Sequence, residues 1–317
     1  MIRVDRLTKR YGAVKAVDRV SFEVGRGEIV GLLGPNGAGK TTTMRMLTTF
    51  LPPTSGRALL AGHDVLDAPL EVRRSVGYLA ENVPLYTEMR VREYLTFRAK
   101  LKDVPWSRRR AAVDGVVDRC RLTEVEHRVL GQLSRGFRQR VGLAEAMVHD
   151  PDILILDEPT AGLDPIQIRE VRALIRELGD RHTILLSTHI MSEVEAVCAR
   201  VIIIAQGRIA QDEPLERLRA GSAIVLEARG PTEPLRALIR AIPGVVKVSP
   251  GARDGEFCAF ELQTRDGADL REAVVQRLVQ GGIPFRMIDR RRVTLEDRFI
   301  QAVTRVAFPE AEEREAV

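Results

Sequence analysis

Residues 28–41 read EIVGLLGPNGAGKT, and this stretch decides the fold. An apolar strand pattern from Ile29 to Leu33 leads directly into residues 34–41, which match the spacing GxxxxGK[ST] in full. Glycines at these positions let the backbone wrap around an anion, so that successive N–H groups and the positive end of the next helix point at phosphate oxygens. The alternative, a glycine-rich turn with a surface lysine, is disfavoured because a strand pattern precedes the loop and a helical pattern follows it. The stretch therefore predicts a phosphate-binding loop in an α/β protein.

The side chains of this loop have different expected roles. Lys40 places a positive charge beside the β- and γ-phosphates of a nucleotide. Thr41 offers a hydroxyl of the kind that ligates Mg²⁺, because that ion prefers hard oxygen ligands. The residues that we expect to contact the nucleotide from this loop are Gly34, Pro35, Asn36, Gly37, Ala38, Gly39, Lys40, Thr41 and Thr42.

A pair of carboxylates follows a second apolar strand, Ile153 to Leu156. Asp157 and Glu158 emerge at its carboxyl end, which is the edge where open α/β sheets bind ligands. We expect Asp157 to hold Mg²⁺ through water and Glu158 to orient or deprotonate the attacking water, a task that needs a base within hydrogen-bond reach. By itself, a strand followed by Asp-Glu is a weak signal, because an Asp that caps the turn after a strand is common.

The segment between these two sites carries a family resemblance. Residues 133–165 read LSRGFRQRVGLAEAMVHDPDILILDEPTAGLDP, which resembles the ATP-binding subunit of an ABC transporter. The family signature, LSGGQ in its commonest form, retains Ser134 and Gly136 here while two other positions differ. In the family this segment presents N–H groups to the γ-phosphate of an ATP molecule held by a second subunit. Asp164, in AGLD, matches a loop that crosses the same interface.

Three further residues match the family by their order along the chain. His189, after the strand ILLST, matches a histidine that contacts the γ-phosphate, and Tyr11 in KRYG matches an aromatic that stacks on adenine. Glu81, in VGYLAEN, stands where most of the family has a glutamine that senses Mg²⁺, so a carboxylate is a departure. Each also has a plain structural reading, as a histidine after a strand, a core or surface tyrosine and an exposed loop glutamate. The resemblance implies ATP and Mg²⁺ as cofactors, with catalytic roles for Glu158, His189 and Lys40 and metal contacts from Thr41, Asp157 and Glu81.

The surrounding periodicity predicts the rest of the first domain. The segments IRVDRLTKRY and VKAVDRVSFEV read as strands, a helix is expected over residues 41–51, and Pro52 and Pro53 stop it. Residues of about 90 to 146 predict an inserted helical subdomain. The runs DILILDEP and HTILLSTH flank the amphipathic REVRALIRELGD, an alternation typical of a buried parallel sheet. The expected fold class is α/β, a P-loop NTPase of ABC type with a mixed sheet core, an antiparallel β subdomain and the helical insert.

After about residue 220 the pattern changes to βαββαβ, the order of a small ferredoxin-like α+β domain. Its segments are AIVLEA, PLRALIRAI, VVKVS, FCAFELQ, a helix from Leu270 to Val279 and PFRMIDR. A closing helix, TLEDRFIQAVT, is expected to be capped by Thr294, with acidic residues in its first turn. The predicted domains are an ATP-binding domain over 1–220, an accessory domain over 221–308 with a regulatory or dimer-supporting role, and a frayed tail over 309–317.

Composition excludes several classes of protein. With 44% apolar and 29% charged residues, the 317-residue chain is not wholly disordered. The formal charge of +5 fits arginines scattered over solvated faces, because the basic run 108–110 has only Trp106 beside it as a stacking aromatic. Three widely spaced cysteines fit reduced cytoplasmic thiols. The N-terminus lacks a signal-peptide pattern and no apolar run nears the ~20 residues of a membrane span, so we expect a chain that does not enter the membrane by itself.

The main hypothesis is an ATPase subunit that needs partners. Two copies, or this chain and a paralogue, would bind two ATP molecules head to tail and drive a separate integral membrane permease from the cytoplasmic face of the membrane. The wording of LSRGFRQRVGLAEAMVHDP and GYLAENVPLYTEMRVREYL is similar to bacterial export-type ATPases of drug, polysaccharide and gliding-motility systems, so we expect export. The helical segment after Glu81, including Tyr86 and Tyr94, is the expected docking surface for the permease. No nucleic-acid partner is expected.

Two alternatives remain open. A non-transport ABC ATPase acting on nucleic acid or ribosomes is disfavoured, because no sustained heptads separate Lys40 from Ser134 and the chain carries one cassette. A degenerate regulatory subunit that binds ATP but barely turns over is suggested by the altered signature and by Glu81. The transported substrate and the choice between homodimer and heterodimer cannot be read from this chain, since selectivity resides in the membrane subunit.

Overall fold

The computed structural model describes residues 1–220, 222–265, 268–292 and 294–307. The chain divides into two compact units, Met1–Glu213 together with the chain from Gln301, and Pro214–Ile300. The division therefore comes a few residues before the predicted limit of 220, and the predicted closing helix is shared between the units. The predicted tail, 309–317, lies outside the described residues.

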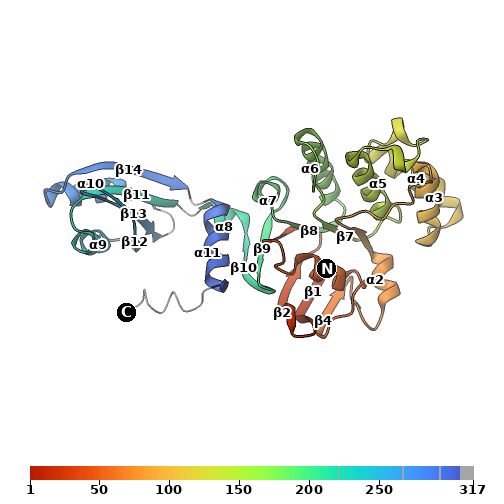
Figure 1. The fold of residues 1–317 in the computed structure, drawn as a ribbon, viewed down its shortest axis with the longest axis horizontal. Coiled ribbons are helices and arrows are strands. Elements are labelled where there is room, and N and C mark those ends of the chain that lie inside the picture. The colour runs from red at the N-terminus through yellow and green to blue at the C-terminus, as the bar shows by residue number, and fades with distance from the viewer. Residues whose placement is uncertain (221, 266–267, 293, 308–317) are drawn as a thin grey trace. The chain divides into compact units, whose positions relative to one another are not determined.

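The first unit contains two sheets (Figure 1). The smaller has the order β2-β1-β4-β5, and its neighbouring strands pair antiparallel. Buried and exposed residues alternate along much of β2, as in a strand with one face on a core and the other in water. The strands are β1 Ile2–Tyr11, β2 Val14–Val24, β4 Ser55–Leu60 and β5 His63–Asp64.

The larger sheet positions the site. Its order is β10-β9-β3-β8-β7-β6, with parallel pairing from β9 through β6. Every residue of β7 and β8 is buried, as expected of parallel strands covered on both faces. The register pairs Leu33 with Thr188 and Asp157 with Ser187, so the carboxyl ends of β3, β7 and β8 share one edge. The strands are β3 Ile29–Leu33, β6 Val76–Leu79, β7 Ile153–Asp157, β8 Thr183–Thr188, β9 Arg200–Ala205 and β10 Arg208–Pro214.

The helix after the phosphate loop is shorter than predicted. It covers Lys40–Leu47 (α1) rather than residues 41–51. Thr49 takes the left-handed conformation, with φ 59°, and the amide of Phe50 donates to the carbonyl of Arg45, which closes the helix four residues early. The other helices that flank the sheets are α2 Pro69–Ser75, α6 Pro165–Gly179 and α7 Met191–Val197.

The helical insert forms as predicted, with one correction. It consists of α3 Val91–Leu101, α4 Trp106–Arg119 and α5 Arg135–Met147, with short turns η1 Thr123–Val125 and η2 Leu130–Gln132. Tyr94 is fully buried, and its hydroxyl donates to Glu145 Oε2 at 2.6 Å. The prediction that Tyr94 belongs to a docking surface is therefore wrong, whereas Tyr86 is half exposed.

The second unit has the predicted βαββαβ order. Its sheet runs β12-β13-β11-β14 with antiparallel pairs, and its own core contains Leu226, Ile239 and Phe260. The elements are α8 Leu215–Ala220, β11 Ser222–Arg229, α9 Thr232–Arg240, β12 Val245–Asp254, β13 Phe257–Thr264, α10 Arg271–Gln280 and β14 Phe285–Arg292. The closing helix, α11 Leu295–Ala307, begins with the predicted cap, because Thr294 Oγ1 accepts from the amide of Asp297 at 3.2 Å.

None of the helices in the described ranges combines the length and the apolar character needed to span a bilayer. Cys120, Cys198 and Cys258 are all free thiols, and burial raises the pKa of Cys120 to about 12. Cys120 therefore stays protonated near neutral pH.

Candidate functional site

The phosphate loop joins β3 to α1, and two of its glycines are required by space. A Cβ at Gly34 would lie 2.4 Å from the carbonyl oxygen of Ile204. A Cβ at Gly39 would lie 2.5 Å from the carbonyl oxygen of Ala16, and Gly39 also has φ 104°. Any other residue would force the loop away from its neighbours, so the glycines hold it against the sheet edge.

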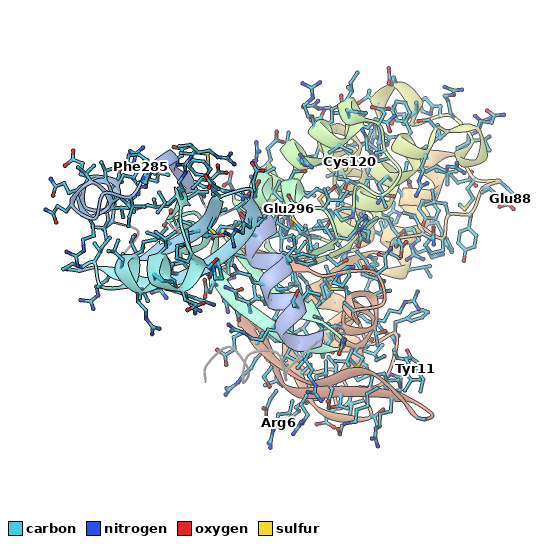
Figure 2. All side chains as sticks on the ribbon, turned by 60° about the vertical axis from the view of Figure 1, so that its left-hand side comes forward. Arg6, Tyr11, Glu88, Cys120, Phe285 and Glu296 are labelled. Atoms are coloured by element: carbon cyan, nitrogen blue, oxygen red, sulfur yellow. The ribbon has the colours of Figure 1, made fainter. Side chains whose placement is uncertain are left out.

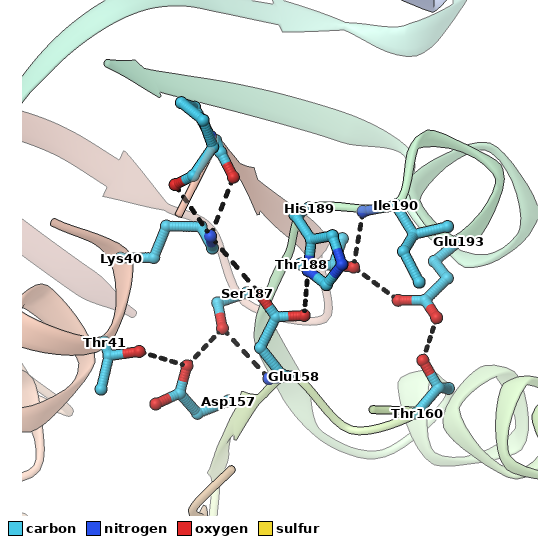
Figure 3. Close-up of polar contacts among 12 residues, drawn as sticks. Lys40, Thr41, Asp157, Glu158, Thr160, Ser187, Thr188, His189, Ile190 and Glu193 are labelled. Atoms are coloured by element: carbon cyan, nitrogen blue, oxygen red, sulfur yellow. Dashed lines mark hydrogen bonds and ion pairs between the residues drawn. The ribbon is translucent and has the colours of Figure 1, made fainter. Parts of the chain in front are cut away.

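Lys40 points into this loop. Its side chain is only 6% exposed, and Nζ donates to the carbonyl oxygens of Gly34 at 2.8 Å and Pro35 at 3.3 Å (Figure 3). Nζ also lies 3.4 Å from Glu158 Oε1. The ammonium group thus stands between the loop and the carboxylate that follows β7, where it can contact phosphate oxygens.

Asp157 is completely buried at the floor of the site. Its Oδ1 accepts from Thr41 Oγ1 at 3.2 Å and from Ser187 Oγ at 2.5 Å. Its Oδ2 is buried and has no hydrogen-bond partner among the described residues. Burial raises the pKa of Asp157, despite the two hydroxyl donors, and the nearby charges of Glu81 and Glu158 raise it further. An unpaired buried oxygen beside a threonine hydroxyl fits a cation such as Mg²⁺ or its water.

The backbone of Glu158 has a conformation that is unusual for a residue other than glycine, and it sets the direction of the side chain. Its φ is 49°, in the left-handed region, and its amide donates to Ser187 Oγ at 3.1 Å. Its Oε2 lies 2.9 Å from His189 Nδ1, while its side chain is 9% exposed. A base held between a lysine and a histidine, near the phosphate loop, has the surroundings expected of a group that orients a water molecule.

These groups line one cavity of about 370 Å³. The structure brings together there most of the predicted phosphate-loop residues, Glu81, Glu158 and His189, with Asp157 hydrogen-bonded to Thr41 beneath them. Two small residues that were not predicted, Ala16 and Ala161, complete the lining. The full lining is Ala16, Asn36, Gly37, Ala38, Gly39, Lys40, Thr41, Thr42, Glu81, Glu158, Ala161 and His189.

Besides Asp157 and the first two residues of the phosphate loop, four predicted residues do not line this cavity. Tyr11 is 50% exposed, and its side chain lies near the tip of the small sheet (Figure 2). Ser134 caps α5, its hydroxyl accepting from the amide of Phe137 at 3.4 Å. Gly136 sits in the first turn of α5 and Asp164 caps α6, where its Oδ1 accepts from the amide of Ile166 at 2.9 Å. Within one chain, the cavity residues and the signature segment are therefore separate.

Sequence reasoning missed two residues that organise the site. Ser187 is hydrogen-bonded to both members of the carboxylate pair. Glu193 is hydrogen-bonded to Thr160 and to Thr188. Ser187 belongs to the strand ILLST and stands two residues before His189. This place in the sequence could have marked it as a residue of the site. Nothing in the sequence around Glu193 indicates that its carboxylate is buried.

Comparisons with known proteins show the family to which the chain belongs. A family profile described as ABC transporter matches residues 17–161. The chain is 39% identical over 229 residues to the bacitracin transport ATP-binding protein BcrA of Bacillus licheniformis, covering 72% of this chain and 74% of that protein. The chain belongs to the ABC transporter ATP-binding proteins. Another such protein, the daunorubicin resistance protein DrrA3 of Streptomyces coeruleorubidus, is 33% identical, and the match covers 94% of each chain.

Solved ABC ATP-binding proteins share the fold of the first unit. One, described as the ATP-binding subunit of an ABC transporter, has a TM-score of 0.64 and 30% identity, covering 69% of this chain and 92% of that one. A dimeric bacterial ABC transporter cassette has a TM-score of 0.63 at 24% identity, covering 68% and 99%, which shows the fold alone. The predicted family, fold class and activity are confirmed: this ABC ATP-binding protein is an ATP-binding and ATP-hydrolysing transporter subunit.

Proposed function

We propose that two copies of this ABC ATP-binding protein close around two ATP molecules, so that each site joins the cavity of one copy to the Ser134 segment of the other. The supporting observation is the separation within one chain: the phosphate loop, Glu158 and His189 line the cavity, but Ser134 and Gly136 do not. Ser134 is exposed at the start of α5, where helix N–H groups attract an anion on a facing molecule. Asp164 would meet the same interface.

Within each site the residues of one copy would divide the work. Lys40 and the loop amides hold the β- and γ-phosphates, while Glu158 orients the attacking water and accepts its proton. His189 fixes the carboxylate of Glu158 through the 2.9 Å contact and reaches the γ-phosphate. Tyr11, with half of its surface free, offers a ring face to adenine.

Thr41 and Asp157 would hold Mg²⁺, with Glu81 beside them. The unpaired Oδ2 of Asp157 and the Thr41 hydroxyl supply the oxygen donors. The metal ion, when bound, neutralises negative charge on the β- and γ-phosphates. Since Glu81 also faces a triphosphate, we assign it to the metal side of the cavity, where its charge attracts the cation.

A trapped dimer tests this proposal. Replacing Glu158 with Gln keeps the shape of the side chain but removes the base, so hydrolysis should fall by about 10²- to 10⁴-fold while ATP still binds. Size-exclusion chromatography with light scattering should then detect an ATP-dependent dimer. The matched variant Lys40→Ala should bind ATP weakly and stay monomeric. Parental turnover in Glu158→Gln, or a monomer at saturating ATP, would contradict the proposal.

We further propose that the subunit drives export through a separate integral membrane permease, on the cytoplasmic face of the membrane. Support comes from the names of its relatives, which include bacitracin transport and daunorubicin resistance proteins. A groove of about 610 Å³ offers a docking surface, because the exposed apolar residues Phe50, Leu70 and Leu101 line it together with Arg73 and Arg74. A permease segment with apolar and acidic residues would fit this lining.

A copurification experiment distinguishes a transport function from the alternative function on nucleic acid. The tagged protein, extracted from membranes with a mild detergent, should retain a multi-span permease that Leu101→Glu releases, with ATP binding unchanged. Recovery of RNA or DNA in place of a permease, with binding that weakens as salt rises, would support the alternative instead.

A further inference from the structure

We propose that Glu193 is a positioning residue that couples the loop bearing His189 to the loop running from Glu158 to Asp164. The inference rests on the proposed function, because it gives Glu193 a part in the same ATP site. Figure 3 shows the carboxylate of Glu193 between Thr160 and Thr188. Glu193 does not line the cavity, so its effect must pass through these neighbours.

One carboxylate is bonded to both loops. Glu193 Oε2 accepts from Thr188 Oγ1 at 2.6 Å, and Oε1 accepts from Thr160 Oγ1. Thr188 immediately precedes His189, and Thr160 stands two residues after Glu158. A shift of Glu193 would therefore displace both partners of the contact between His189 and Glu158.

The direction of these bonds calls for an acceptor on the Thr188 side. The Thr188 hydroxyl accepts from the amide of Ile190 at 3.0 Å and donates its own proton to Glu193 Oε2. This chain of bonds ties the residues before and after His189 to one acceptor, which holds the loop at that point.

The second loop connects to the helix that begins at Ser134. Gln139, a buried residue of α5, donates from Nε2 to the carbonyl oxygen of Pro159 at 3.0 Å. A continuous series of contacts therefore runs from α5 through Pro159 and Thr160 to Glu193 and on to Thr188. Contact with a partner copy at the start of α5 can reach His189 by this route.

The burial of Glu193 argues against a purely structural role for its carboxylate. Glu193 is 2% exposed on α7, next to the buried Val194, and an apolar side chain there would avoid the desolvation of a carboxylate. A structural role predicts that substitutions change stability without a selective change in turnover. A positioning role predicts a fall in kcat with ATP binding preserved.

The test compares Glu193→Ala, Glu193→Gln and Thr160→Val in the full chain, with ATP as the substrate. Glu193→Ala should lower kcat about 10- to 100-fold, because a misplaced catalytic group costs about that much, while KM and ATP affinity stay within about threefold. Glu193→Gln should recover most of the activity, since its amide oxygen can accept from Thr188 and its NH₂ can donate to Thr160. Glu195→Gln, on the exposed side of the same helix, is the matched control and should hydrolyse ATP at the parental rate.

A double variant shows whether the two residues act as one unit. Thr160→Val combined with Glu193→Ala should be no slower than Glu193→Ala alone, because both changes break the same connection. Multiplied losses, or a kcat within about twofold of parental in Glu193→Ala, would overturn the proposal. If Glu193→Ala does not fold, the kcat of Thr160→Val decides: a parental value overturns the proposal, and a selective fall supports it.

Failure of the proposed function gives a different result. In that case Lys40→Ala would retain turnover, whatever the Glu193 variants do. If Lys40→Ala is inactive and Glu193→Ala is fully active, only the role of Glu193 is rejected.

Discussion

Among single residues, His149 shows how burial sets a charge. Its Nε2 lies 3.2 Å from the carbonyl oxygen of Val76, and its Nδ1 is buried with no partner among the described residues. Burial, helped by the positive charge of Lys102, lowers the pKa of His149 to about 3. The unfolded chain takes up this proton near pH 6.5. Neutral His149 therefore makes its full contribution to the free energy of unfolding above that pH, and the contribution is lost as the pH falls toward 3.

We predict that His149→Gln weakens this acid sensitivity. Between pH 6.5 and pH 5 the parental protein should lose at most about 2 kcal/mol of unfolding free energy through His149, and the variant should not lose this part. Urea unfolding at pH 7 and pH 5 measures the difference. His127→Gln, at an exposed position, should keep the parental pH dependence. Equal pH dependence in His149→Gln and the parental protein would rule out this role.

Some residues of the site could be predicted from the sequence, and others could not. The phosphate loop and the Asp157–Glu158 pair were predictable, because fixed spacings and strand ends carry their chemistry. Glu193 was not, since its partner Thr160 lies 33 residues away along the chain and only the folded structure brings the two together. Ser187 is 30 residues from Asp157, and only its place two residues before His189 could have marked it. The catalytic and metal-binding roles remain predictions.

Among the elements, α6 depends on one cap. Asp164 Oδ1 accepts from the amides of Ile166 and Gln167 at 2.9 and 3.0 Å, and Pro165 occupies the first helical position. Asp164→Ala should lower the unfolding free energy by about 1 kcal/mol, whereas Asp164→Asn should retain most of it, because Asn also caps helices. Urea unfolding of the two variants measures this. Equal losses in both would mean that charge, rather than capping, matters here.

Element boundaries and buried faces were partly predictable. The spacing of Val91, Tyr94 and Leu95 already marks one face of α3, and that signal should have excluded Tyr94 from a docking surface. The early end of α1 could not be predicted, because it depends on the left-handed conformation of Thr49, which is not a residue that usually adopts it.

At the scale of the whole molecule, each unit has a core of its own. Phe260 is 1% exposed within the core of the second unit, and no residue of that cluster comes from the first. Phe260→Ala should destabilise the second unit by about 3 to 5 kcal/mol. Differential scanning calorimetry should show one transition at lower temperature, with the other transition and ATP affinity unchanged. Phe50→Ala, at a position 73% exposed, is the control. A joint shift of both transitions would contradict independent cores.

The order of elements was predictable across both units, because α/β alternation and the βαββαβ pattern each leave a clear periodicity. The division at Pro214 was not, since α8 follows β10 directly and Pro214 is the single residue that marks the boundary. Partners and transported substrate lie outside what one chain encodes.

The backbone at Glu158 has a consequence for protein engineering. A non-glycine residue at φ 49° carries roughly 1 to 2 kcal/mol of conformational cost, which glycine would relieve. Selection for heat resistance alone would therefore favour Glu158→Gly, the change that also deletes the base. Only a screen that scores ATP consumption together with thermal tolerance would keep this carboxylate in place.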